Sequence, residues 1–371
     1  MSSINLHSKE FDRSTITKLE IFEDYAQAWI PTFVMVPHYK EIHIFDFFAG
    51  PGYDVKNIPG SPIRILKKII EQKENIIKSN TRIVFHLNEY EPKRKSQNKY
   101  ELLKTNCERL LACEHDIVQN VKLLFYNKDA EELFFDLVPL MDKYPALVYL
   151  DQNGIKFISK EYIQVLESIN TLDFLYFISS SHFKRYGSTD EFKRVLELSK
   201  EELKSIEYNT IHRFISENIT SKLITNSELK IFPFSLKKNS NIYGIVFGSK
   251  SYLAVDKFLS IAWSKNRDNG EANFDINQEH EKLQFDMFGE GKMTKIEKFQ
   301  SDLEIEILNK TLINNKDVLI YTYQNGHIPK HSTEVIKKLK KNKLLLYHTR
   351  TPYISYNKVF KEVNIISYKL I

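Results

Sequence analysis

The stretch that decides the fold is I-H-I-F-D-F-F-A-G-P-G, which runs from Ile42 to Gly52. Ile42–Phe45 is a short apolar run of the kind found in a strand that is covered on both faces. Asp46 stands where that strand should end, and Gly50 and Gly52 allow a tight turn in which the backbone approaches a ligand closely. A strand, an acid and a glycine turn together predict a nucleotide-like ligand at the carboxyl edge of an open α/β sheet.

Two other glycine-rich loops do not fit this turn. A P-loop ends in Gly-Lys-Ser/Thr, whereas Gly52 is followed by Tyr53 and Asp54. The dinucleotide fingerprint requires a third glycine where a helix opens, and none occurs here. The D-x-F-A-G-x-G pattern instead resembles the first motif of class I methyltransferases, which use S-adenosyl-L-methionine (SAM). The alternative is an ordinary strand and turn in an α/β domain.

Acids follow the next predicted strands, which are Arg82–Leu87, Val121–Tyr126 and Ala146–Leu150. After the second strand, Glu89 is expected to accept the two hydroxyls of a ribose, with Glu91 in reserve. In a SAM domain the acid after the third strand faces the adenine amine. Asp129 suits that place, and it equally suits the N-cap of the following helix. The predicted cofactor-binding residues are therefore Asp46, Phe48, Gly50, Gly52, Glu89 and Asp129.

The loop after the fourth strand, Asp151-Gln152-Asn153-Gly154, would face the methyl group and the substrate. Enzymes that methylate amino groups usually carry Asp/Asn-Pro-Pro-aromatic here, where carbonyls accept the amine hydrogens and the ring stacks on a flipped base. This chain keeps the acid and lacks both prolines, and the first aromatic residue downstream is Phe157. We predict that Asp151 orients the nucleophile and that Asn153 accepts an N–H.

A fifth strand is predicted at Phe174–Ser180, and hydroxyls, cations and aromatic rings gather in the loop after it. Ser181, His182 and Arg185 are the predicted substrate-binding residues of this loop, in a pattern typical of nucleic-acid contacts. His182 has no obvious partner in the sequence, which favours a cap or a phosphate contact over a general base. Lys230–Leu236 and Asn241–Gly248 are expected to form a hairpin. A class I methyltransferase sheet ends in such an antiparallel pair.

The helices that flank these strands have recognisable starts. An amphipathic helix is expected over Ser14–Trp29, with Ser14 or Thr15 as its cap and with Lys18 and Tyr25 near the cofactor. Ser61 is expected to cap a helix over Ile63–Asn75.

The C-terminal part predicts a second domain. Residues 1–265 form the expected Rossmann-like domain, residues 266–293 a linker packed on it, and residues 294–371 a basic winged-helix-like domain. Its expected elements are Ile296–Asn309, Asp317–Gln324 (helix or strand), a helix over Glu334–Lys343 capped by Ser332 or Thr333, and wing strands at Leu344–Tyr347 and Val363–Ile366. On its last helix, Lys337, Lys338 and Lys341 are expected to contact phosphate. Lysines without arginines favour backbone contact over base reading, and a solvated face is the alternative.

Composition fits this organisation. The chain has 371 residues, of which 42% are hydrophobic, and a net charge of +5 that permits an anionic partner. Its two cysteines, Cys107 and Cys113, form no zinc pattern, so no metal site is expected. The polar N-terminus and the lack of any apolar run of roughly 20 residues predict a cytoplasmic protein without a membrane segment.

Taken together, these motifs resemble the three-Cys-motif partner (TcmP) family of bacterial proteins over nearly the whole chain. The marks are Lys18–Trp29, the Asp46–Gly52 turn, Gly60-Ser61-Pro62, Asn88-Glu89-Tyr90-Glu91-Pro92, Asp151 with Gly154, and the basic C-terminal helix. Members usually show Asp-Pro-Phe-Gly where this chain has Asp-Gln-Asn-Gly. The resemblance implies a methyltransferase fold with an appended winged helix and a partner with a three-cysteine, radical-SAM-like iron–sulfur motif.

The predicted function is methyl transfer from SAM to nucleic acid, most simply to an amino group of a base. The alternative is a non-catalytic module that binds SAM or nucleic acid and recruits the three-cysteine partner, which the altered loop after Asp151 favours.

Overall fold

The computed structural model describes residues 10–92, 98–151, 156–179, 189, 195, 210–238, 241–278 and 293–371. The chain folds into two compact units, Met1–Lys250 and Ser251–Ile371. None of the helices in these described ranges is long and apolar enough to cross a membrane.

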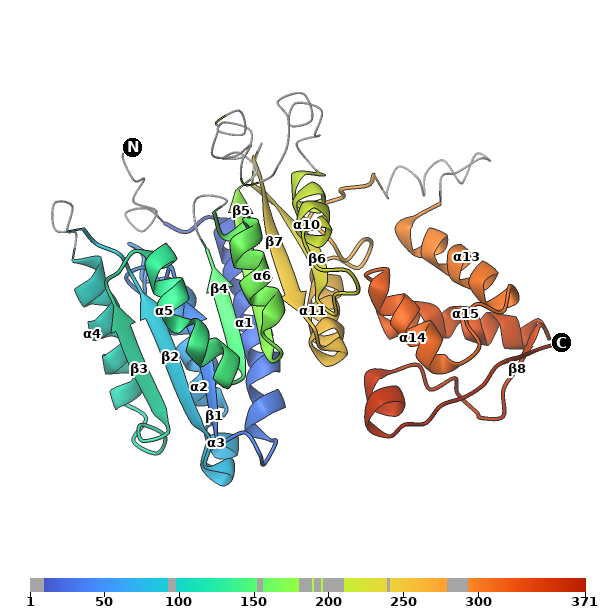
Figure 1. Cartoon of the computed structure of the whole chain (residues 1–371), viewed down its shortest axis with the longest axis horizontal. Coiled ribbons are helices and arrows are strands. Elements are labelled where there is room, and N and C mark those ends of the chain that lie inside the picture. Colours follow the sequence, from blue (N-terminus) through green and yellow to red (C-terminus); the bar gives the residue numbers. More distant parts are fainter. Residues whose placement is uncertain are drawn as a thin grey trace. The chain divides into compact units, whose positions relative to one another are not determined.

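The first unit is built on a seven-stranded, mostly parallel sheet (Figure 1). Its strands are β1 (Glu41–Asp46), β2 (Arg82–Asn88), β3 (Val121–Tyr126), β4 (Ala146–Leu150), β5 (Leu172–Ser179), β6 (Lys230–Lys238) and β7 (Asn241–Ser249). Their order is β3-β2-β1-β4-β5-β7-β6, and β7 runs antiparallel to both of its neighbours. This is the strand order of the class I methyltransferase sheet, so the predicted fold class is confirmed.

Helices cover both faces of the sheet. They are α1 (Arg13–Val34), α2 (Ser61–Glu71), α3 (Lys73–Ser79), α4 (Lys99–Ala112), α5 (Ala130–Lys143), α6 (Lys160–Ser168) and α10 (Ile211–Ser221), with a short 3₁₀ turn η3 at Lys156–Ile158. On one face, α5, α6 and α10 pack on β1, β4 and β5 in a single apolar cluster. On the other face α1 packs against β4, where the rings of Phe22 and Tyr149 lie 4.9 Å apart. Because both faces are covered, β4 is apolar and buried along its whole length.

Two helix starts differ from the prediction. α1 begins at Arg13, and the carboxylate of Asp12, not Ser14 or Thr15, caps it by accepting the Thr15 N–H at 3.0 Å. Gly60 is the N-cap of α2, and Ser61 is the first helical residue. The hydroxyl of Ser61 is free for another role because no helix N–H uses it.

A chain of hydrogen bonds crosses β1, β2 and β3 beneath α5. Glu41 contacts His43 Nε2 at 3.0 Å, His43 Nδ1 contacts His86 Nε2 at 2.9 Å, and His86 Nδ1 contacts the Tyr126 hydroxyl at 2.9 Å. Burial lowers the pKa of both histidines, so both imidazoles are neutral. Because the Glu41 carboxylate only accepts, Tyr126 then donates to His86, His86 to His43 and His43 to Glu41, and both rings are protonated on Nε2.

The second unit is mainly helical. It contains α11 (Tyr252–Lys265), α13 (Lys295–Leu308), α14 (Asn315–Gln324), α15 (Pro329–Lys341), the strands β8 (Leu345–Leu346) and β9 (Lys369–Leu370), and a π-helical turn η5 (Asn357–Lys361). A capping box formed by Thr294 and Glu297 starts α13, and the side chain of Asn314 caps α14. Within this unit, the Trp263 indole donates to the Gly326 carbonyl at 2.9 Å.

The winged helix differs from the prediction at three points. The segment of uncertain type at Asp317–Gln324 is helical. α15 begins at Pro329, so Ser332 lies inside the helix and is buried rather than a cap. The second wing strand is β9 and not Val363–Ile366, because Leu345 pairs with Leu370.

The buried His86 predicts a pH dependence of folding. Burial lowers the pKa of His86 to about 3, whereas an unfolded histidine titrates near 6.5. The unfolded chain therefore binds a proton that the folded chain does not, and stability falls as the pH drops below about 6.5. We expect His86 to account for a loss of about 2 kcal/mol between pH 7.5 and pH 5.

Urea unfolding of the His86→Gln variant tests this effect. The unaltered chain should lose about 2 kcal/mol more than the variant over that pH range. The exposed His115 provides the control, since His115→Gln should keep the pH dependence of the unaltered chain. Equal pH dependence in the His86 variant and the unaltered chain would contradict the prediction.

Candidate functional site

Asp46 ends β1 as a buried carboxylate, with 2% of its surface exposed. Its Oδ2 accepts the Ser61 hydroxyl at 2.6 Å, and its Oδ1 accepts the Phe48 N–H at 3.2 Å. Burial raises the pKa of Asp46 to about 7, while these two hydrogen bonds lower it and the negative charge of Asp151 raises it further. The first turn of α2 is thereby tied to the end of β1, and the glycine turn lies between them.

The glycine turn contacts the acid that follows β2. Gly50 and Gly52 both adopt positive φ, of 68° and 99°. The Gly50 N–H donates to Glu89 Oε2 at 3.0 Å. A Cβ at Gly52 would lie 3.3 Å from Ile63, so side chains other than glycine are disfavoured there by both conformation and space. Burial raises the pKa of Glu89, and Lys99, whose Nζ lies 4.0 Å from Oε1, opposes this rise.

Asn88, the last residue of β2, joins the turns that follow β1 and β3. Its amide nitrogen donates to the carbonyls of Phe47 and Lys128, each at 3.1 Å, and its oxygen accepts the Lys128 N–H at 3.2 Å. Asp129 therefore lies next to a residue fixed against the β1 turn. Its side chain accepts the Glu131 N–H at 2.9 Å, so it is the N-cap of α5, one of the two roles expected of it.

Asp151 follows β4 and pairs with Lys18 of α1. Lys18 is buried, and its ammonium also lies 4.4 Å from the centre of the Phe177 ring on β5. Burial raises the pKa of Asp151, and Lys18 opposes this rise. Of the two α1 side chains expected near the cofactor, Lys18 reaches the carboxyl edge, whereas Tyr25 is fully buried and donates to Asp173 at 2.7 Å.

Five of the predicted cofactor and catalytic residues are thus linked by hydrogen bonds or by charge at one edge of the sheet. The direct contacts join Asp46 to Phe48 and Gly50 to Glu89, and the charge of Asp151 acts on Asp46. Asn153, Ser181, His182 and Arg185 lie outside the described residues. Phe157 is buried against Phe47 and Phe134 in the core, so its ring is not available to a substrate.

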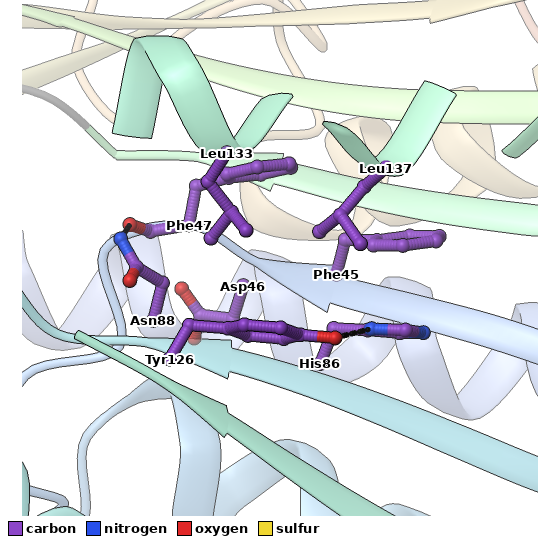
Figure 2. Close-up of a pocket in the computed structure, with 8 residues that line it drawn as sticks. All are labelled: Phe45, Asp46, Phe47, His86, Asn88, Tyr126, Leu133 and Leu137. Carbon is purple, nitrogen blue, oxygen red and sulfur yellow. Dashed lines mark hydrogen bonds between the residues drawn. The ribbon is translucent and has the colours of Figure 1, made fainter. Parts of the chain in front are cut away.

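Figure 2 shows a small hollow between the strand ends and α5. Its lining residues are Phe45, Asp46, Phe47, His86, Asn88, Tyr126, Leu133 and Leu137. The Asp46 carboxyl points away from the two α5 leucines, Leu133 and Leu137 (Figure 2). The hollow has no room for even a water-sized group, so it is too small for an adenosyl group. We therefore assign no cofactor to it.

The second unit carries most of the net positive charge of the chain. It contains 19 lysines and arginines and 15 acids, whereas residues 1–250 contain 34 and 33; within it, residues 293–371 contain 14 and seven. On α15, Val335, Ile336 and Leu339 are buried, which leaves Lys337, Lys338 and Lys341 exposed. Lys338 forms an ion pair with Glu304 of α13 at 2.9 Å. Lys337 and Lys341 are therefore the better candidates for phosphate contacts.

Comparison with known families identifies the same unit. Residues 271–352 match the family model of the GMT-like wHTH domain. A winged helix-turn-helix domain therefore lies at the C-terminal end of a chain whose first unit has the class I methyltransferase fold. No curated protein sequence matches this chain at a significant level.

Three residues that organise the edge are not predicted as site residues by the sequence. The sequence predicts Ser61 as a helix cap and places Asn88 in the loop after the second strand. Asn106 of α4, which donates to the Pro51 carbonyl at 2.9 Å, carried no signal. The sequence did contain a signal for Asn88. A polar side chain at the end of an apolar strand is costly to bury unless it has hydrogen-bond partners, so such a residue is expected to join neighbouring segments.

The Ser61–Asp46 contact predicts a measurable change in titration. Ser61→Ala removes a hydrogen bond to the charged form of Asp46, so the pKa of Asp46 should rise above its value of about 7. The measurement is a carbon-13 NMR titration of the labelled aspartate carboxyl groups, assigned with Asp46→Asn. The control is Ser249→Ala, which removes a hydroxyl that donates to Asp173 instead. An unshifted Asp46 titration in Ser61→Ala would show that the hydrogen bond is not formed in solution.

Proposed function

We propose that the first unit binds SAM at the carboxyl edge of its sheet and transfers the methyl group to a nucleic acid held by the second unit. The contact between the Glu89 carboxylate and the Gly50 N–H is the observation that carries this proposal. It brings the acid after β2 against the glycine turn after β1, which is the arrangement that a nucleoside with a charged tail requires.

The residues present fit this cofactor. A carboxylate offers about four lone-pair positions, so Glu89 can keep the Gly50 N–H and also accept the ribose hydroxyls. Gly52 lets the backbone of the turn pack closely against Ile63 and Asn106, and Asp46 and Phe48 lie beside this turn on the proposed methionine side. Asp129 would accept the adenine amine through the oxygen that does not cap α5. When bound, SAM supplies a methyl group on a positively charged sulfur.

The acceptor would lie beside the loop after β4. Methyl transfer is a direct displacement that requires alignment and the removal of one proton, so it needs no strong nucleophile from the protein. Asp151 is the carboxylate available for that proton. Asn153, Ser181, His182 and Arg185 remain the proposed contacts to the acceptor on the sequence pattern alone.

The proposed partner of the second unit is DNA or RNA. Lys337 and Lys341 are exposed on α15 of a winged helix, and lysines neutralise phosphates without reading bases. The resemblance to the TcmP family adds a second proposed partner, a protein with a three-cysteine iron–sulfur motif.

Isothermal titration calorimetry with SAM tests the cofactor. Glu89→Ala should weaken binding at least tenfold, because hydrogen bonds to a charged group contribute about 1.5–3 kcal/mol. The Glu89→Gln variant should bind SAM nearly as weakly as Glu89→Ala, although its side-chain oxygen can still accept the Gly50 N–H. Glu91→Ala is the matched control, since Glu91 accepts the Tyr100 N–H at 3.1 Å, and it should change affinity less than threefold.

A chain that shows no heat of binding with SAM would overturn the cofactor assignment. If SAM binds and tritiated SAM transfers no label to duplex or single-stranded DNA or RNA, the non-catalytic binding module is the correct function. The altered Asp-Gln-Asn-Gly loop makes this outcome a specific alternative.

The salt dependence of nucleic-acid binding tests the second unit. Each lost phosphate contact lowers the slope of log K against log salt by about 0.9, so the double variant Lys337→Ala/Lys341→Ala should lower it by about 2. The measurement is fluorescence anisotropy with labelled 20-mer duplexes between 50 and 200 mM salt. Lys298→Ala on α13 is the exposed control and should leave the slope unchanged. Equal slopes in the double variant and the unaltered chain would exclude α15 from the interface.

A further inference from the structure

We infer that Lys18 is a positioning residue for the methyl acceptor: its ammonium holds Oδ2 of Asp151 as a carboxylate and leaves Oδ1 to accept a hydrogen from an N–H or O–H group. The inference rests on the proposed function and names the acceptor class of that same site. The methyl acceptor would be a neutral hydrogen-bond donor, such as the exocyclic amine of a base, because a carboxylate repels an anionic acceptor.

Contacts at the ends of two neighbouring strands hold the Lys18 ammonium in place. Its ammonium pairs with Oδ2 of Asp151 after β4 and lies 4.4 Å from the centre of the Phe177 ring on β5. Only 8% of the Lys18 surface is exposed. An ammonium buried to this extent is costly unless it is paired, so this contact differs from a solvated surface ion pair.

Asp151 is the more open member of the pair. Its side chain is 21% exposed, against 10% for Lys18. Among the described residues only Lys18 makes a hydrogen bond to this carboxylate, and that bond is to Oδ2. The charged groups that act on Asp151 are Lys18, which favours the carboxylate, and the buried Asp46, whose like charge disfavours it. Lys18 therefore favours the charged form of Asp151, in which Oδ1 can accept a hydrogen.

The proton balance of the step follows from this arrangement. The acceptor atom forms a bond to the methyl carbon while the carbon–sulfur bond breaks and its electron pair stays on sulfur. The proton of the acceptor passes to Oδ1 of Asp151, which becomes a carboxylic acid and later releases the proton to water. Lys18 makes no bond to the acceptor in this scheme and acts only through Asp151.

The test compares Lys18→Met, which removes the charge, with Lys18→Arg, which keeps it. In a carbon-13 titration of labelled aspartate, assigned with Asp151→Asn, Lys18→Met should raise the pKa of Asp151 by at least one unit, and Lys18→Arg should stay near the unaltered value. The acidic limb of the pH profile for methyl transfer to nucleic acid should move to higher pH by the same amount. The control Lys67→Met removes an exposed lysine of α2 and should leave the limb in place.

Calorimetry separates this inference from the proposed function. Failure of the unaltered chain to bind SAM overturns the proposed function. If SAM binds Lys18→Met within threefold of the unaltered affinity and the acidic limb does not move, the Lys18 inference alone is wrong. Lys18→Gln, which can still donate to Asp151 but carries no charge, takes the place of Lys18→Met if that variant does not fold; the limb should shift in the same direction, and an unmoved limb overturns the inference.

Discussion

The buried carboxylate of Asp46 is the constraint on which the rest of the site depends. A carboxyl group with so little exposed surface must find hydrogen bonds inside the protein. Its partners come from both sides of the glycine turn: the Phe48 N–H precedes the turn, and the Ser61 hydroxyl follows it at the start of α2. Satisfying one acid therefore brings the two ends of the turn together, and the turn between them has positive φ at Gly50 and Gly52.

The same edge gathers carboxylates of raised pKa. Burial raises the pKa of Asp46, Glu89 and Asp151, and the cations that act against it, Lys99 and Lys18, face Glu89 and Asp151. Asp46 has no cation among its hydrogen-bond partners, and the charge of Asp151 further disfavours its ionised form. A ligand that carries positive charge would relieve this repulsion. SAM has both a sulfonium and an ammonium group, so the electrostatics of the edge agree with the proposed cofactor.

Local patterns were sufficient to predict most of the fold. The apolar runs of β3 and β4 have the predicted bounds, and the antiparallel pair β6–β7 was expected from its turn. At the site, the errors occur where a side chain prefers a distant partner to a local one. Ser61 is a good N-cap by type, yet its hydroxyl bonds to Asp46, 15 residues earlier in the chain. Lys18 and Asp151 are 133 residues apart, and no local pattern could predict their pairing.

The two units differ in their distribution of charge. Residues 1–250 have nearly equal numbers of lysines and arginines, 34, and of acids, 33, and the carboxyl edge of the sheet concentrates three of these acids. Such an edge suits a cationic cofactor but attracts a polyanion weakly. Within the second unit, residues 293–371 have twice as many lysines and arginines as acids, and α15 of the winged helix exposes lysines. If the acceptor is a nucleic acid, its phosphates must be held mainly by the second unit, which leaves the first unit to select the group that receives the methyl.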